Sequence, residues 1–141
     1  MIGKKRRTAK IDSLIGQHTE VEGNIVFSGG LHVDGKSKGN VMASDPDSLL
    51  TVSDQGSVEG EVRVPNIILN GLVIGDVYAS ERVELASQAR VQGNVYYNLI
   101  EMAIGAEVNG KLVHRSKDEQ MEQIEQSSVL EVGDNAKNDK S

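Results

Sequence analysis

A five-residue phrase with a central glycine recurs six times through the middle of the chain. The six central glycines are Gly23, Gly39, Gly60, Gly75, Gly93 and Gly110. Consecutive glycines are separated by 16, 21, 15, 18 and 17 residues. Such self-similarity at a short, nearly constant period is typical of a solenoid, because one unit is too small to bury a core alone. Apolar and polar residues alternate within each copy, which is the period of a β-strand. The sequence therefore predicts an all-β parallel solenoid of about six rungs.

Aligning the copies on the glycine predicts which side chains point inward. Positions two before, two after and four after the glycine are mostly apolar, whereas the positions between them are polar, with Ile74 as the exception. A second apolar pair precedes each phrase and predicts another strand per rung. These pairs are Leu31/Val33, Leu50/Val52, Ile67/Leu69, Val83/Leu85 and Met102/Ile104. The longest step contains Asp45-Pro46-Asp47-Ser48, which predicts a turn inserted on the outside of the rod.

Composition fits this architecture and narrows the setting. Aromatic residues make up only 3% of the chain, so a globular core built on large rings is not expected. The chain has no cysteine, which excludes a disulfide frame and a thiolate metal site. No apolar run approaches the roughly 20 residues that span a bilayer, and the start lacks the apolar segment of a signal peptide. We therefore expect a cytoplasmic protein.

Charge is unevenly distributed along the chain. The first ten residues carry five basic side chains and no acidic one, whereas the residues after 114 are rich in Glu, Asp, Gln, Asn and Ser. Such polar segments cannot bury enough apolar surface to offset the entropy lost on ordering. We predict a disordered basic arm at 1–13, a β-helix domain at 14–114 and a disordered acidic tail at 115–141.

The ends of the predicted rod lack any evident cap. Solenoids normally need polar capping repeats, because a terminal rung otherwise leaves open strand edges and core side chains. Neither flank has the pattern of an amphipathic capping helix. We therefore expect subunits to stack end to end. The predicted contact residues are Leu14, Ile15 and Val21 at one end and Ile104, Val108 and Leu112 at the other.

Several segments together resemble the bactofilins, which are bacterial polymer-forming cytoskeletal proteins. The segments are Ile15–Ile25, Val33-Asp34-Gly35, Ala79–Leu85 and Gly105–Gly110, and the resemblance covers about residues 14–113. It rests on order and spacing across all rungs. The resemblance implies a right-handed β-helix, filament assembly without nucleotide, and scaffolding of cell-envelope enzymes, often at the membrane.

Two motifs suggest other functions. Residues 30–37 match the Walker A pattern, but Leu31 and Val33 alternate as strand residues inside it and another rung follows. A P-loop needs a helix after the motif to hold phosphate.

His18, His32 and His114 are the only histidines, and they form no cluster at metal-ligand spacing. We expect no catalytic residue, no metal and no cofactor.

Two surface features predict interactions. In the basic arm, Met1 and Ile2 precede a cationic run, Lys4, Lys5, Arg6 and Arg7. This pattern favours anionic membrane, at roughly 1 kcal/mol per basic residue, and a filament multiplies weak contacts through avidity. A merely solubilising tail and a nucleic-acid arm remain alternatives.

Three positions after each glycine lies an outer stripe: Val26, Met42, Arg63, Tyr78, Tyr96 and Val113. An exposed apolar stripe indicates lateral or partner contacts, unless the acidic tail or a turn covers it.

The favoured hypothesis combines these features. It is a bacterial scaffold that polymerises with itself, lies on the inner face of the cell membrane and localises cell-envelope proteins, with no small-molecule substrate. Two alternatives stay open at this stage. One is a solenoid enzyme of the acyltransferase or carbonic-anhydrase type, and the other is a monomeric solenoid adaptor.

Overall fold

The computed structural model of the chain describes residues 12–116, and this part is entirely β-structure. The expected basic arm up to residue 11 and the acidic tail from 117 lie outside the described residues. The strands are β1 (Ser13–Ile15), β2 (Glu20–Glu22), β3 (Ile25–Val26), β4 (Gly30–Val33), β5 (Lys36–Lys38), β6 (Val41–Met42), β7 (Leu49–Val52), β8 (Ser57–Glu59), β9 (Val62–Arg63), β10 (Asn66–Leu69), β11 (Leu72–Ile74), β12 (Val77–Leu85), β13 (Arg90–Gln92), β14 (Val95–Met102), β15 (Glu107–Asn109) and β16 (Leu112–His114).

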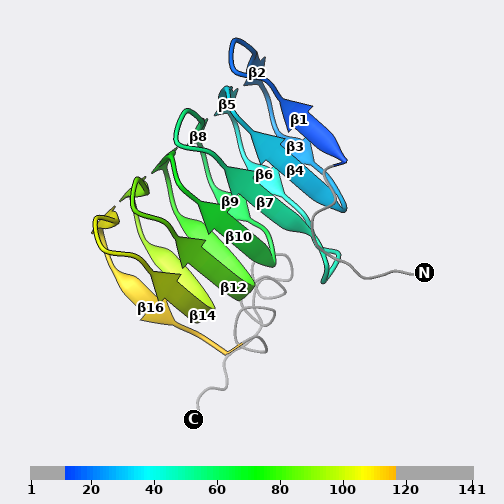
Figure 1. Cartoon of the computed structure of the whole chain (residues 1–141). Helices are drawn as coiled ribbons and strands as arrows, with labels where there is room; N and C mark the ends of the chain where they lie inside the picture. The colour runs from blue at the N-terminus through cyan, green and yellow to red at the C-terminus, as the bar shows by residue number, and fades with distance from the viewer. Residues whose placement is uncertain (1–11, 117–141) are drawn as a thin grey trace, which may run out of the picture.

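The strands wind into a parallel solenoid of about six turns, which confirms the predicted fold class (Figure 1). Each turn contributes three short strands, one to each of three faces. The first face contains β1, β4, β7, β10 and the second halves of β12 and β14. The second face is the six-stranded sheet β2-β5-β8-β11-β13-β15. The third face contains β3, β6, β9, the first halves of β12 and β14, and β16. Turn 1 begins with β1, and turn 6 begins in the second half of β14.

The recurring glycine forms the corner between the second and third faces. The phrase that looked like one strand is therefore two strands of different sheets, separated by a bend. Gly60 has a φ of 146°, and a Cβ there would lie 2.3 Å from the carbonyl oxygen of Gly39 in the turn before. Only glycine accepts this conformation and this close approach. The near-constant spacing of the glycines thus reflects the stacking of one corner directly on the next.

The predicted inward columns form the core. Val58, Val62 and Val64 of turn 3 are buried, and the equivalent residues of turns 2, 4 and 5 are buried with them, except that Tyr97 of turn 5 is half-buried. Ser37 replaces valine in one column and is also buried, with no hydrogen-bond partner for its Oγ. The predicted turn at 45–48 is present, since the Ser48 amide donates to the Asp45 carbonyl at 2.9 Å.

One predicted strand pair was wrong. Ile100 and Met102, not Met102 and Ile104, lie in register with Val83 and Leu85. Ile104 instead occupies the turn after β14 and is 97% exposed. The error arose because the register of β14 with β12 shifts by one residue between the third and first faces: Arg82 lies three positions after Ala79, whereas its partner Leu99 lies two positions after Tyr97. The apolar pattern gives no sign of this shift.

Candidate assembly surfaces

Burial of the core columns falls sharply at both ends of the solenoid. In the column two positions after the glycine, Val41, Val62, Val77 and Val95 are at most 1% exposed. The equivalent Ile25 of turn 1 is half-buried, and Leu112 of turn 6 is 44% exposed. Inner turns are covered on both sides by neighbouring turns, whereas the first and last turns are covered on one side only. Among residues 12–116, the core is therefore open at both ends.

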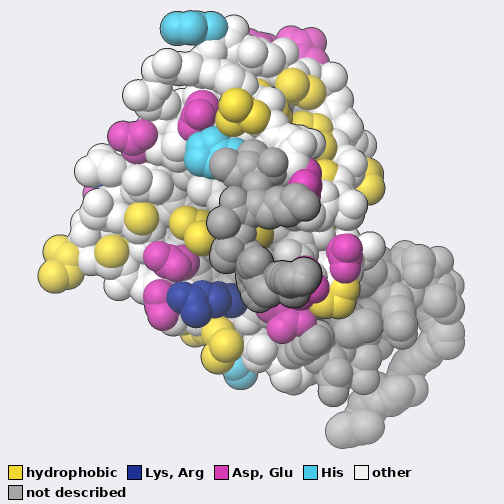
Figure 2. All heavy atoms as spheres, turned by 45° about the vertical axis from the view of Figure 1, so that its right-hand side comes forward, with side chains coloured by type: hydrophobic (Ala, Val, Ile, Leu, Met, Phe, Trp, Pro, Cys, Tyr) yellow, Lys and Arg dark blue, Asp and Glu magenta, His cyan; other side chains and the backbone are white. Residues whose placement is uncertain are grey.

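Exposed apolar side chains concentrate on the same two turns. Within the described part of the chain, seven large hydrophobic side chains are exposed, and six of them belong to turn 1 or turn 6. They are Leu14 and Val26 in turn 1, and Leu99, Met102, Ile104 and Leu112 in turn 6. Figure 2 shows exposed hydrophobic side chains among charged side chains that are mostly acidic. Because clustered exposed apolar side chains are typical of interaction sites, the two end turns are the candidate assembly surfaces.

Within the described part of the chain, the first and last turns also present open strand edges (Figure 1). At five corners the glycine amide donates to the following turn, for example from Gly75 to the Gln92 carbonyl at 3.0 Å and from Gly93 to the Asn109 carbonyl at 3.1 Å. Gly110 is the sixth corner glycine, and its amide has no acceptor within residues 12–116. Unpaired edges of this kind are templates for pairing with another chain.

The predicted end residues differ in where they point. Ile15 is buried under turn 2, and Val21 and Val108 are half-buried members of the core columns. Leu14 pairs in register with the outward-facing His32 and is 60% exposed, so it lies on the first face rather than in the core. Ile104 projects from a turn at the rim. The structure thus brings together half-buried core residues and exposed rim residues at each end.

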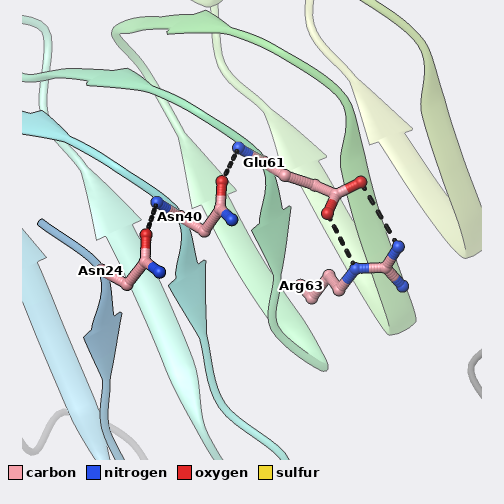
Figure 3. Close-up of polar contacts among 4 residues, drawn as sticks. All are labelled: Asn24, Asn40, Glu61 and Arg63. Carbon is pink, nitrogen blue, oxygen red and sulfur yellow. Dashed lines mark hydrogen bonds and ion pairs between the residues drawn. The ribbon is translucent and has the colours of Figure 1, made fainter. Parts of the chain in front are cut away.

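A ladder of polar side chains secures the corner between the second and third faces. Oδ1 of Asn24 accepts a hydrogen bond from the Asn40 amide at 2.9 Å, and Oδ1 of Asn40 accepts one from the Glu61 amide at 3.0 Å (Figure 3). The Glu61 carboxylate turns away to Arg63, whose Nε lies 3.1 Å from Oε1. The ladder resumes with Oδ1 of Asp76, which accepts from the Asn94 amide at 2.9 Å, and Oδ1 of Asn94, which accepts from the Lys111 amide at 3.0 Å. These polar positions therefore have a structural role, and the amides they bind belong to successive turns.

The outer stripe is a continuous column along the third face, as predicted. Its members pair in register from β3 through β16: Val26, Met42, Arg63, Tyr78, Tyr96 and Val113. The Tyr78 and Tyr96 rings stack with centroids 4.6 Å apart, and the Arg63 guanidinium lies 4.2 Å from the Tyr78 ring centroid. Burial raises the pKa of the Tyr78 phenol, and the nearby Glu61 carboxylate raises it further. The middle of the stripe is thus an ordered aromatic and cationic stack, while Val26 at its start is 76% exposed.

The motifs that suggested other chemistry lie in ordinary solenoid surroundings. Strands β4 and β5 occupy the Walker-like segment, and the strand β6 follows it, so the helix that a P-loop requires is replaced by β-structure. His32 points outward, with Nε2 2.9 Å from Oδ1 of Asp34. A hydrogen bond with Ser53 and the adjacent His32 hold the pKa of Asp34 below its ordinary value. In residues 12–116 no group of three His, Cys, Asp or Glu side chains is placed to hold a metal.

The arm residues Met1, Ile2 and Lys4 to Arg7 lie outside the described residues. Across residues 12–116, no helix is long and apolar enough to cross a membrane.

Sequence reasoning missed two features of the last turn. Arg90 of turn 5 donates hydrogen bonds to the Ala89 carbonyl of its own turn and to the Gly105 carbonyl of turn 6, and the Gly110 amide has no acceptor within residues 12–116. An arginine beside an apolar strand residue gives no signal of such a contact. The repeat pattern shows that Gly110 is the last copy, but only the stacking of the turns shows that each corner glycine amide donates to the turn that follows it.

The matches to known proteins are to bactofilins. The bactofilin family model, described as polymer-forming cytoskeletal, matches residues 13–113. The chain is similar to bactofilin BacO of Myxococcus xanthus, with 29% identity over 77% of this chain and 84% of BacO. It is also similar to bactofilin BacP of the same organism, with 28% identity over 72% of this chain and 41% of BacP. No solved structure gives a significant match.

Proposed function

Since the chain belongs to the bactofilin family of polymer-forming cytoskeletal proteins, we propose that its subunits stack end to end into filaments without nucleotide. The filament would be a bacterial scaffold. The family implies self-association, and we propose that the contact lies on the two end turns.

The main support for this proposal is that core side chains are buried in the inner turns and partly exposed in the terminal turns. Val95 in turn 5 is completely buried, whereas Leu112, which occupies the same column in turn 6, is 44% exposed. A further turn placed on β14, β15 and β16 would bury Leu112 and Val108 and would give the Gly110 amide an acceptor. Burial of apolar area is favourable at roughly 25 cal/mol per Å². Another subunit is a natural source of such a turn, because it carries the same spacing of strands.

Attachment to membrane and recruitment of partners are further parts of the proposal. The arm that carries Lys4, Lys5, Arg6 and Arg7 would hold the filament at the anionic inner face of the cell membrane. Each arm alone would bind weakly, and many arms on one filament would bind firmly. Cell-envelope proteins would then be localised along the filament.

The outer stripe is proposed as the lateral or partner-binding surface. It runs the length of the third face, so stacked subunits would continue it along the filament. Tyr78 and Tyr96 are held by their mutual stacking and by Arg63, and such rigid aromatic side chains lose little entropy on binding. Met42→Glu would then weaken bundling or partner capture without shortening single filaments, as electron microscopy can measure.

Electron microscopy of the purified protein, without nucleotide or metal, tests the end-to-end assembly. The full-length chain should form filaments, with or without added ATP. Leu112→Arg introduces a charge that stacking would bury, and an uncompensated buried charge typically costs about 3–5 kcal/mol. This variant should leave short species. Lys36→Ala, which removes the lysine of the Walker-like segment, should assemble like the parent.

Ile74→Arg is the matched control. Ile74 is 39% exposed in β11 of turn 4, close to the exposure of Leu112, but it lies in an inner turn, with turn 5 between it and the last turn. It should form filaments like the parent. Circular dichroism should show that both arginine variants are folded. Long filaments of folded Leu112→Arg would remove the C-terminal end from the contact, and ATP-dependent assembly lost in Lys36→Ala would restore the nucleotide-binding alternative.

A further inference from the structure

The Asn-Gly dipeptide occurs twice in the chain, and the fold treats the two copies differently. Asn70-Gly71 lies between β10 and β11 in the middle of the solenoid, and Asn109-Gly110 lies at the last corner. Asparagine is a chemically labile residue, and a following glycine removes the side chain that would otherwise hinder ring closure. We propose that Asn109-Gly110 is a site of spontaneous deamidation on a free C-terminal end, and that subunit stacking closes it.

The reaction needs only groups of this dipeptide and water. The Gly110 backbone nitrogen attacks Cγ of Asn109, a bond forms between them, and the bond from Cγ to Nδ2 breaks. The Gly110 amide proton leaves with the departing group as ammonia, and a five-membered succinimide remains. Water then opens either carbon–nitrogen bond of the ring. The products are aspartate, or isoaspartate in which the main chain runs through the former side chain.

The attacking nitrogen is free at the last corner. The glycine amides of the five earlier corners are occupied by hydrogen bonds of 2.8 to 3.1 Å to the following turn. The Gly110 amide has no acceptor within residues 12–116. Asn109 and Gly110 are both exposed, and no hydrogen bond holds the Asn109 side chain in the part of the chain that is described. Among the described strands, β15 pairs with β13 alone, so Asn109 can leave the extended conformation more easily than a residue between two strands.

The first copy of the dipeptide is protected. Oδ1 of Asn70 accepts a hydrogen bond from the Gln88 amide at 2.9 Å, which holds the carboxamide away from the backbone. Gly71 is buried, and a Cβ there would lie 2.2 Å from the Ser53 carbonyl oxygen and 2.4 Å from that of Gly56. Ring closure at Asn70 would therefore require this tightly packed backbone to move. The fold thus leaves room for ring closure at Asn109-Gly110 and prevents it at Asn70-Gly71.

Deamidation would change the end on which assembly depends. It places a carboxylate beside Glu107, which lies on the same outward face of β15. The isoaspartyl product also adds one backbone carbon at a position that pairs in register with Gln92. Either change disfavours the addition of another turn. Free ends would accordingly become capped with age, while ends already buried in a filament would keep their asparagine.

Peptide mass spectrometry of aged protein tests both halves of the proposal. Two samples are incubated at neutral pH. One is the assembled parent. The other is Ile104→Arg, in which the new charge at the exposed rim should prevent stacking and leave the end free. In folded Ile104→Arg, Asn109 should deamidate at least several-fold faster than Asn70. In parent filaments, Asn109 should react several-fold more slowly than in the variant. Asn109→Gln should abolish the modification at this position, because the larger ring closes far more slowly.

The experiment tests two claims separately: that Asn109 is a deamidation site, and that stacking protects it. The second claim rests on the proposed end-to-end stacking. Equal deamidation rates at Asn70 and Asn109 in the folded variant would refute the first claim. Equal rates at Asn109 in the variant and in filaments visible by electron microscopy would overturn the protection and leave filament formation intact. If the parent forms no filaments, the stacking and the protection fail together, and the comparison of Asn109 with Asn70 in the same sample still decides the site.

Discussion

The Arg90 guanidinium donates from Nη1 to the carbonyl oxygen of Gly105 at 3.0 Å, which ties turn 5 to the loop of turn 6. The same nitrogen donates to the Ala89 carbonyl at 2.8 Å, and Nε lies 3.5 Å from the Glu107 carboxylate. Turn 6 has a neighbouring turn on one side only, so this side chain supplies contacts that inner turns obtain from packing. The loop that it holds carries Ile104, one of the exposed residues of the proposed contact surface.

Arg90→Ala should loosen the last turn. Loss of the charge-assisted hydrogen bonds should lower the free energy of unfolding by about 1–2 kcal/mol. Hydrogen exchange at the Ala106 amide should become faster, because that amide belongs to the loop. Arg82→Ala is the control, since Arg82 makes only exposed ion pairs with Glu84 and Glu101, worth about 1 kcal/mol or less. Equal effects of the two variants would show that Arg90 has no special role at the end.

Gly60→Ala should be strongly destabilising. A φ of 146° is unfavourable for any residue with a Cβ, at about 1–3 kcal/mol. The added Cβ would also lie 2.3 Å from the Gly39 carbonyl oxygen, so turns 2 and 3 would be pushed apart. Gly16→Ala is the control, because its nearest neighbour would be Thr19 Oγ1 at 3.7 Å and its φ lies outside the left-handed range. Chemical denaturation should show a large loss for the first variant and a small change for the second.

Ser37→Val should stabilise the solenoid. Ser37 is 1% exposed and its Oγ has no partner, and an unsatisfied buried hydroxyl costs about 1–3 kcal/mol. The residues paired with it on either side are Val21 and Val58, so valine continues an existing column. Ser57→Val, on the outward side of the same sheet, should change the free energy of unfolding by no more than about 0.5 kcal/mol. A loss of stability in Ser37→Val would mean that the column has no room for two methyl groups.

Deletion of residues 2–7 should abolish sedimentation with anionic liposomes and leave filaments intact. The arm carries four of the cations that attract such a surface, Lys4, Lys5, Arg6 and Arg7. Added salt should weaken binding of the parent, because exposed charges are screened within about 8 Å at physiological ionic strength. Leu112→Arg should bind liposomes much more weakly than the filament, since each arm then acts alone. If the truncated chain sediments as well as the parent, the outer stripe becomes the better candidate for membrane contact.

Local spacing explains why so much of the fold could be predicted. A strand has a side-chain period of two, and a corner such as Gly60 must stack directly on Gly39, so the inward columns can be read from the glycines alone. The outer stripe followed from the same alignment, and the register of Tyr78 with Tyr96 confirms it. The family resemblance drawn from the order of the rungs is confirmed by the bactofilin match over residues 13–113.

The candidate site was predictable only in outline. Open ends follow from the first and last repeat, and Val108 and Leu112 lie there as expected. The inward pair Met102/Ile104 was wrong, because the register shift between β12 and β14 makes Ile100 and Met102 the inward pair. Ile104 as a contact residue of the end stays a prediction. The contact of Arg90 with Gly105 joins two turns that are 15 residues apart in the chain. No repeat pattern encodes a contact that occurs once.

The sequence by itself determined the repeat, the inward columns and the corner glycines, because these depend on local backbone geometry that every turn shares. Only the tertiary structure decided which groups at the ends are left without partners. Three strands per turn, the continuous course of β12 and β14, and the reach of Arg90 all depend on how one turn rests on the next. The Gly110 amide, which has no acceptor within residues 12–116, is the clearest case, since the corner glycine of each of the five earlier turns donates to the turn that follows.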